Sequence, residues 1–157
     1  MGWKLPPKIK VLEALGAVSG NKVHVLSSEK AEVESFDGSE KFLVIWKPEK
    51  SAITSNDSGS EYGGYLGHPS LAFLMVLGVL PFDLYLGRKL AEVPWSKLKN
   101  RYKDHLLIIK EATINWSDLD KQRMDKFVDW ILKMLEGLDL NKPDEGPRTL
   151  TEFVGKE

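Results

Sequence analysis

The sequence predicts an α+β fold: a short N-terminal helix, a small antiparallel sheet of three to four strands, and a helical C-terminal half packed on that sheet. Between residues 22 and 55, apolar and polar residues alternate as in half-buried strands. After residue 69 the apolar residues recur at helical spacing instead. No repeat and no internal boundary interrupts residues 1–140, so we expect one globular domain there, followed by an extended tail over residues 141–157.

The first element predicted is a helix from Pro7 to Leu15. The preceding Pro6 and Pro7 are suited to a helix start, because proline is tolerated in the first helical turn. Ile9 and Leu12 lie on one face with Leu15, and Gly16 is predicted to end the helix.

The sheet is predicted from four segments. Residues 22–27 and 31–36 alternate in polarity, and the Asp37-Gly38 pair is typical of a tight turn before the next strand. Residues 41–47 are almost all apolar, so this strand is expected to be central and covered on both faces. Residues 51–55 are the candidate for a fourth strand, which would complete an antiparallel meander.

Two helices are expected after the sheet. Pro69 should open a helix that runs to about Leu77 and is apolar all round, which places it deep in the core. Gly78 and Pro81 should end it, and a shorter helix is expected over residues 84–92.

Two more amphipathic helices complete the prediction. Pro94 should open the first of them, whose apolar residues at helical spacing are Leu98, Tyr102, Leu106 and Ile109. Ser117 resembles an N-terminal cap for the last helix, and Gly137 is its predicted end. The predicted apolar face of that helix consists of Met124, Phe127, Val128, Ile131 and Leu135.

Composition excludes several classes of function. The 157 residues contain no cysteine, which excludes disulfides, thiolate metal sites and a cysteine nucleophile. No nucleotide-binding glycine motif is present and the three histidines stand far apart, so we expect no cofactor and no metal. A net charge of −1 argues against nucleic acid as a partner, and the basic residues of 88–110 are interpreted as a solvated helix face.

The same features favour a cytoplasmic location. The first ten residues contain no apolar stretch of the secretory kind. The longest apolar run, residues 71–80, is shorter than the roughly 20 residues that cross a bilayer, so no association with a membrane is expected.

The chain resembles a class of known proteins in two of its segments and in its composition. The segments KIKVLEALGAV and GYLGHPSLAFLM stand in a cysteine-free chain that is rich in lysine and glutamate and has one glutamine. In these features the chain resembles the small uncharacterised conserved proteins of hyperthermophilic archaea. Its composition is also the bias reported for hyperthermophile proteins. The resemblance implies no particular activity.

The best candidate site is the glycine-rich segment of residues 54–68. Its candidate ligand-binding residues are Asn56, Asp57, Tyr62 and His68, and its glycines allow close backbone approach. His68 precedes Pro69, so its imidazole should lie at a helix N-terminus, where an anion is favoured. A purely structural loop, with tyrosines packed over the core, is the alternative interpretation.

Two functions therefore stay open. The first is a non-catalytic binding or protein-interaction module, with a homodimer as one form of it. Its support is the apolar segment 71–86, with Phe82 and Tyr85, and a tail whose apolar residues Leu150, Phe153 and Val154 could contact a partner. The second is a site for a small polar or anionic ligand in the 54–68 loop. There, serines, Asp57 and His68 also supply the residue types of a hydrolase, although no nucleophile-elbow motif is present.

Overall fold

The computed structural model describes residues 2–143, and the predicted tail lies almost wholly outside them. Its elements confirm the predicted α+β class: an N-terminal helix, a four-stranded antiparallel sheet and a helical C-terminal half. In chain order they are α1 (Lys8–Ser19), β1 (Val23–Val25), β2 (Lys30–Glu34), β3 (Lys41–Lys47), η1 (Pro48–Lys50), β4 (Ala52–Ser55), η2 (Gly59–Gly63), α2 (His68–Val76), α3 (Leu84–Ala91), α4 (Trp95–Arg101), α5 (His105–Ala112) and α6 (Asp118–Leu138).

The sheet is the predicted meander, with strand order β1-β2-β3-β4 and antiparallel pairing throughout. In the β2–β3 register Ala31 is opposite Val44, and in the β3–β4 register Trp46 is opposite Ile53. All four of these side chains belong to the main core. Leu43 and Ile45, on the alternate positions of β3, form a second small buried cluster. The near-continuous apolar run of β3 is therefore buried on both faces, as predicted.

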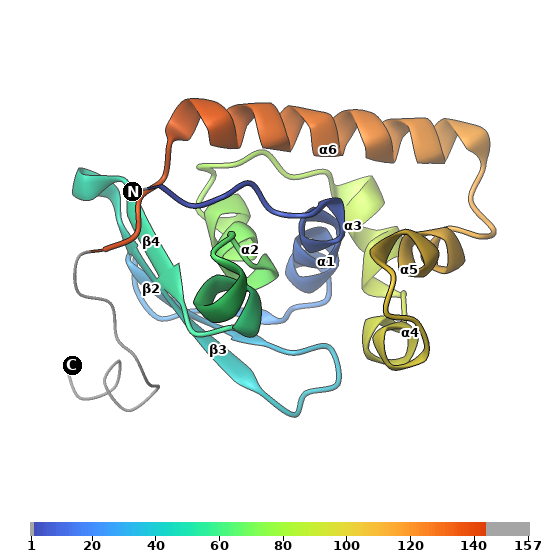
Figure 1. Cartoon of the computed structure of the whole chain (residues 1–157), viewed down its shortest axis with the longest axis horizontal. Coiled ribbons are helices and arrows are strands. Elements are labelled where there is room, and N and C mark those ends of the chain that lie inside the picture. The colour runs from blue at the N-terminus through green and yellow to red at the C-terminus, as the bar shows by residue number, and fades with distance from the viewer. Residues whose placement is uncertain (1, 144–157) are drawn as a thin grey trace.

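Helix α2 packs against all four strands of the sheet, and α1 packs against α2 and α3. Helix α6 lies across the helical layer along its whole length (Figure 1). Both α1 and α2 are buried on nearly all sides, so the core extends through them from the sheet to α3 and α6. The five residues predicted as the apolar face of α6 are all buried against this core. The first residue of α2, His68, is buried at the start of this enclosed helix.

Gly16 does not end the first helix, contrary to the prediction. α1 continues to Ser19, and Gly16 lies in its interior against the backbone of α3. A Cβ added at Gly16 would stand 2.8 Å from the carbonyl oxygen of Leu90, and one added at Gly87 of α3 would stand 3.2 Å from the carbonyl oxygen of Leu15. The two glycines thus let α1 and α3 cross at close range. In the sequence, a glycine needed for such a helix crossing looks the same as a glycine that ends a helix.

The helix predicted after Pro94 is in fact two helices. Tyr102 takes an extended conformation and ends α4, and Asp104 then caps α5 by accepting a hydrogen bond from the Leu106 amide at 2.8 Å. Helical spacing of apolar residues continues across the break, so periodicity alone does not reveal it. The side chain of Asp104 provides the physical reason, because a capping aspartate satisfies the free amides of a new helix start.

The last helix begins where it was predicted to begin and ends slightly beyond the predicted end. The Ser117 hydroxyl accepts a hydrogen bond from the Asp120 amide at 3.1 Å, as expected for a cap. Gly137 lies inside α6, and Asp139 in the left-handed conformation closes it instead. No helix of the described residues is both long enough and apolar enough to span a bilayer.

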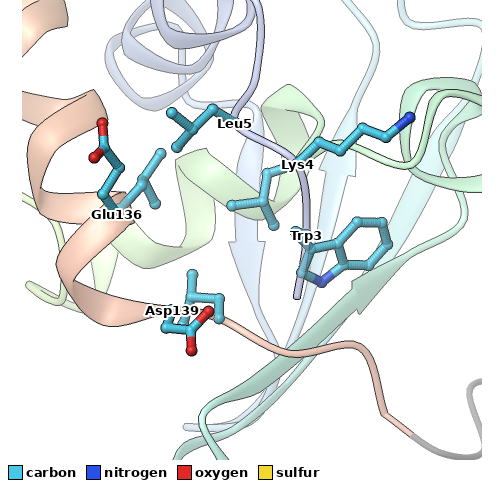
Figure 2. A pocket seen from close by; sticks show the side chains of 8 residues that line it. Trp3, Lys4, Leu5, Glu136 and Asp139 are labelled. Carbon is cyan, nitrogen blue, oxygen red and sulfur yellow. The ribbon is translucent and has the colours of Figure 1, made fainter. Parts of the chain in front are cut away.

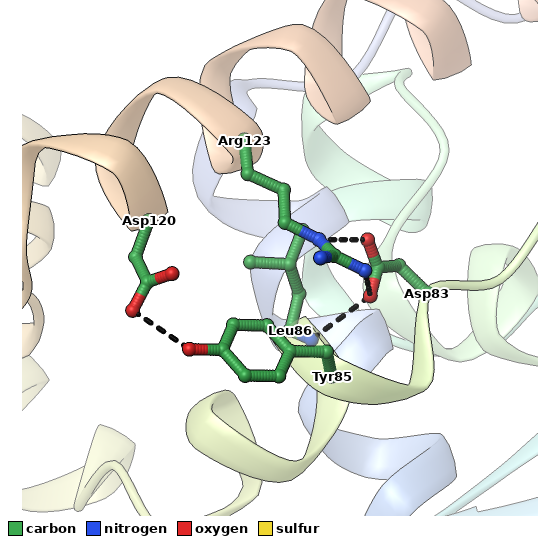
Figure 3. A network of polar contacts seen from close by, with 5 residues as sticks. All are labelled: Asp83, Tyr85, Leu86, Asp120 and Arg123. Carbon is green, nitrogen blue, oxygen red and sulfur yellow. Dashed lines mark hydrogen bonds and ion pairs between the residues drawn. The ribbon is translucent and has the colours of Figure 1, made fainter.

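A polar network fastens α3 to α6. Asp83 caps α3 by accepting from the Leu86 amide at 3.0 Å and also accepts two hydrogen bonds from the Arg123 guanidinium, at 2.8 and 3.0 Å. Tyr85 lies beneath that guanidinium and donates its hydroxyl to Asp120 at 3.0 Å (Figure 3). Tyr85, one of the two aromatic residues that support a partner surface in the sequence, thus contacts Asp120 and Arg123 of its own chain and is 46% exposed.

The two ends of the described chain meet beside β4. Asn141 forms a bridge with Ala52 of β4. Its carbonyl accepts a hydrogen bond from the Ile53 amide at 3.0 Å, and its amide donates one to the Ser51 carbonyl at 2.8 Å. Trp3 donates its indole N–H to the Ile53 carbonyl at 2.8 Å. The edge of β4 is covered by the segment that follows α6.

Candidate functional site

The glycine-rich segment is folded tightly on itself. Its central part forms the single π-helical turn η2, and the ring of Tyr65 lies across this turn against Gly59 and Gly63. A Cβ at Gly59 would stand 2.7 Å from the Tyr65 ring, and one at Gly63 would come closer still. These two glycines therefore make room for a tyrosine of the same loop.

Two of the four predicted ligand residues hold the loop in place. The Asn56 side-chain oxygen accepts a hydrogen bond from the Leu43 amide at 3.0 Å, which ties the loop to β3. The buried Asp57 carboxylate accepts from the hydroxyl of Ser60 at 2.7 Å and from its amide at 3.2 Å. The same carboxylate packs against Gly67, where an added Cβ would overlap it.

The other two predicted residues lie in opposite environments. Tyr62 is 86% exposed to solvent. His68, the first residue of α2, is buried, and its Nε2 makes no hydrogen bond. Of the four residues, His68 lines the first of the two cavities described below, and Asn56, Asp57 and Tyr62 line neither of these two.

The cavity beside His68 has a volume of about 220 Å³ and draws its walls from five parts of the chain. These parts are α1, the loop between β2 and β3, β3 itself, the 54–68 segment with the start of α2, and α4. The residues that line it are Glu13, Ser35, Phe36, Asp37, Ser39, Glu40, Phe42, Ser58, His68, Trp95, Ser96 and Lys99. It thus combines aromatic side chains with buried ionisable groups, a mixture that is typical of ligand sites.

Aromatic rings enclose the imidazole. The ring centroid of His68 lies 5.6 Å from that of Phe36 and 6.0 Å from that of Phe42, the second in an edge-on arrangement. Phe36 also contacts Trp95, which is fully buried and donates its indole N–H to the Leu90 carbonyl. This burial lowers the pKa of His68 to about 4, so the imidazole is uncharged at neutral pH.

Opposite the imidazole, one buried carboxylate is shared by two lysines. Glu13 is fully buried on α1, where Lys10 Nζ lies 3.1 Å from its Oε1 and Lys99 Nζ of α4 forms an ion pair with its Oε2. Burial raises the pKa of Glu13, but nearby positive charge outweighs burial and leaves this pKa below its ordinary value; at neutral pH, where His68 is uncharged, that charge is carried by Lys10 and Lys99. Glu13 is therefore an anion fixed beside the cavity.

The serines of the loop do not form a hydrolytic triad with His68. The Ser60 hydroxyl donates to Asp57, so the acid that would orient the histidine is bound to a serine instead. The Ser55 hydroxyl is buried without a hydrogen-bond partner, and Ser58 lines the cavity. Of the residues that the structure describes, no group of three or more histidine and carboxylate side chains is placed to hold a metal ion.

A second cavity lies between the N-terminal segment and the end of α6. Its volume is about 320 Å³, and Figure 2 shows Trp3 and Leu5 on one side of it with Glu136 and Asp139 on the other. The remaining lining residues are Lys4 and three leucines, Leu66, Leu135 and Leu140. None of the buried polar atoms that lack a hydrogen bond in residues 2–143 belongs to this lining, so the His68 cavity is the better candidate.

Three residues of the cavity, Glu13, Lys99 and Trp95, were not predicted as site residues from the sequence. Glu13 gave a usable signal, because it stands four residues after Ile9, on the buried side of an apolar helix where a charge needs a partner. Lys99 was assigned with its neighbours to a solvated helix face, and only the fold brings it to Glu13. Trp95 gave no signal that separates a cavity wall from ordinary core.

Comparison with known proteins identifies one family. The family model described as "Uncharacterised conserved protein UCP014422" matches residues 3–141 of the chain. No curated protein and no solved structure matches the chain.

Proposed function

We propose that this chain, which belongs to a family of uncharacterised conserved proteins, binds a small polar molecule. The proposed site is the cavity lined by Glu13 and His68. The observation that carries the proposal is the Nε2 atom of His68, which is buried in the cavity wall without a hydrogen bond. A buried polar atom left without a partner costs about 1–3 kcal/mol. Such an atom is expected where a bound molecule supplies the missing partner.

The walls favour a particular kind of ligand. Phe36, Phe42 and Trp95 offer apolar contact to a flat or compact body, and His68 with Lys99 offers polar contact to one end of it. The volume of about 220 Å³ limits the ligand to a small molecule. The carboxylates of Asp37 and Glu40 lie in the outer wall and work against an anion, so we propose an uncharged polar ligand.

Binding without catalysis fits the histidine best. A general base works well when its pKa lies near the operating pH, and the pKa of His68 is about 4. At neutral pH the imidazole is a hydrogen-bonding group and a weak base. The hydrolase alternative is supported less, because Asp57 is bonded to Ser60 and not to His68.

The test is a ligand screen with the urea midpoint of unfolding as the readout. The panel contains small amides, alcohols, sugars, carbonyl compounds, amines and carboxylates, measured on the wild type, on His68→Phe and on His105→Phe. Saturation at 100 times the dissociation constant adds about 2.7 kcal/mol to the free energy of unfolding. We expect a stabilising compound whose effect is lost in His68→Phe and kept in His105→Phe, since His105 is exposed on α5.

The unliganded variant gives an independent reading. Phenylalanine keeps a ring between Phe36 and Phe42 and removes the unpaired nitrogen, so His68→Phe should leave the unliganded protein as stable as the wild type or about 1 kcal/mol more stable. A marked loss of stability, together with no compound that distinguishes the two variants, would show that His68 is a structural residue and would refute the proposal.

Self-association, a cytoplasmic location and a hot habitat stay proposals from the sequence. The homodimer has one supporting observation in the described residues: Leu106 on α5 and Leu119 on α6 are 74% and 77% exposed. The tail residues that also motivated it lie outside the described part. Sedimentation velocity on the wild type and on Leu106→Asp tests the dimer, and the thermal midpoint tests the habitat.

A further inference from the structure

A buried carboxylate of the cavity wall, that of Glu13, is contacted by two lysines, of which Lys99 also lines the cavity. Glu13 carries one negative charge and is in ion-pair contact with two ammonium groups, those of Lys10 and Lys99. The side chain of Glu13 is fully buried, and those of Lys10 and Lys99 are 15% and 36% exposed. Burial disfavours the charged form of both lysines, and the charges around each one decide how far its pKa moves.

The surroundings decide which lysine this is. Burial lowers the pKa of Lys10, but Glu13, Tyr65 and Asp57 together outweigh it and raise that pKa above its ordinary value. Burial also lowers the pKa of Lys99, and there Glu13 does not compensate, partly because the charge of Lys10 acts in the same direction as burial. Lys99 is therefore the lysine that more readily becomes a neutral amine.

The position of Lys99 gives that amine something to act on. Trp95 and Lys99 are four residues apart on α4, so they lie on one side of the helix, and both line the cavity. His68 and Phe36 line it as well. An amine that is desolvated beside a second cation is the arrangement by which proteins activate lysine toward carbonyl groups.

From this geometry we infer that Lys99 is the reactive amine of the cavity and that the molecule bound there is a small aldehyde or ketone, held reversibly as an imine. The inference rests on the proposed function and specifies its ligand. A carbonyl compound is uncharged and polar at one end, which matches the ligand class argued above. Lys10, which ion-pairs with the same carboxylate, takes the role of the second cation.

The reaction balances with water as its only by-product. The lone pair of Lys99 Nζ forms a bond to the carbonyl carbon, and the electrons of the C=O π bond move to the oxygen. The nitrogen loses a proton, which the adjacent Glu13 carboxylate is placed to accept, and the oxygen gains one. The hydroxyl takes a second proton from solvent and leaves as water while the nitrogen lone pair forms the C=N bond, and the protonated imine then returns that proton to solvent. Neither oxidant nor reductant takes part.

The test uses benzaldehyde with sodium cyanoborohydride at pH 7, which reduces any imine to a stable benzylamine. Peptide mass spectrometry then gives the rate of labelling at each lysine. We expect Lys99 to be labelled severalfold faster than Lys97, because burial lowers the pKa of Lys99 and so leaves more of its amine neutral at pH 7. Lys97 is exposed on the same helix and is the internal reference.

Two variants separate reactivity from exposure. Lys99→Arg keeps the cation beside Glu13 but forms no imine, so labelling at this position should vanish while the fold is retained. Lys10→Met removes the second cation, which should raise the pKa of Lys99 and slow its labelling, and the pH at which labelling reaches half its maximum should rise. If Lys99 were labelled through exposure alone, Lys10→Met would leave its rate unchanged, and that result would overturn the inference.

Benzyl alcohol distinguishes failure of the inference from failure of the proposed function. It has the same ring without a carbonyl group, and its binding is followed by the NMR signals of the His68 imidazole. If benzyl alcohol perturbs those signals but Lys99 is labelled no faster than Lys97, cavity binding stands and the imine is refuted. If benzyl alcohol leaves the signals unchanged and Lys99 is labelled at the rate of Lys97, both proposals are contradicted for this ligand class.

Discussion

Gly16 of α1 lies directly against the carbonyl oxygen of Leu90 on α3, with no space for a side chain between the two helices. A Cβ at Gly16 would stand 2.8 Å from that oxygen, and the atom it would meet is backbone, which cannot rotate away. This contact sets the distance between α1 and α3. The contact also helps to position the cavity residues, because Glu13 is on α1 and Lys99 is on α4, which follows α3 directly in the chain.

The first prediction concerns this crossing. Gly16→Ala should destabilise the protein by about 1–3 kcal/mol, because overpacking forces the helices apart. Gly137→Ala is the matched control, since Gly137 is also inside a helix but faces open space. It should stabilise by about 0.5–1 kcal/mol through helix propensity. Urea unfolding of both variants measures the difference. Equal effects of the two changes would contradict the role assigned to Gly16.

A second prediction concerns the charge shared by the two lysines. Glu13→Gln leaves Lys10 and Lys99 without an anion between them and should cost about 3 kcal/mol. Adding Lys99→Met to this variant removes one of the stranded cations, so the double variant should be less destabilised than the sum of the two single changes. A double-mutant cycle measured by urea unfolding gives this coupling. Strict additivity would mean that the ion pair contributes nothing.

The third prediction follows from the pKa of His68, which burial lowers to about 4 from an ordinary 6.5. Between these values the unfolded chain binds a proton at this residue that the folded protein does not. The free energy of unfolding should therefore fall as the pH drops from 6.5 to 4, by up to about 3 kcal/mol, and should not depend on His68 above pH 7. The ionisable groups around His68 are Glu13, Lys10, Lys99 and Asp57.

Urea midpoints between pH 4.5 and 7.5 test this dependence. The slope should be much reduced in His68→Phe and preserved in His105→Phe, since His105 is exposed. An unchanged slope in His68→Phe would assign the pH dependence to other groups and would remove the support for a neutral, buried imidazole.

The fourth prediction concerns the polar network between α3 and α6. Asp83→Ala removes both the cap of α3 and the partner of Arg123, and it should cost at least about 1 kcal/mol. Arg123→Gln keeps the cap and removes an exposed ion pair together with the contact of the guanidinium on Tyr85, and it should cost clearly less. Thermal unfolding of the two variants checks the order of the effects. A larger loss for Arg123→Gln would show that the ion pair, and not the cap, holds α3 in place.

The fold was predictable because its signals are local. Alternation over the strands, the Asp37-Gly38 turn and the Ser117 cap each depend on neighbours in the chain, and each is found in the structure. Gly16 was misinterpreted because its reason is Leu90, which lies far along the sequence. The break at Asp104 was missed because the apolar spacing continues through it.

The site was predictable only in one residue. His68 was selected for its place at a helix start, and it does line a cavity. The glycines of the loop were interpreted as access for a ligand, yet Gly59 and Gly63 accommodate Tyr65. Glu13 and Lys99 belong to different helices and meet through tertiary packing, so no spacing in the sequence brings them together.

The segment after α6 covers the edge strand β4 of the sheet. An exposed strand edge offers unpaired amides and carbonyls to any other extended chain, and Asn141 takes up this position beside β4 through its bonds to Ile53 and Ser51. Within residues 2–143 the sheet is then open to strand addition only at β1, which is three residues long. Loss of the pairing at Asn141 would turn β4 into a template for intermolecular β-sheet growth, so this short segment guards the protein against aggregation.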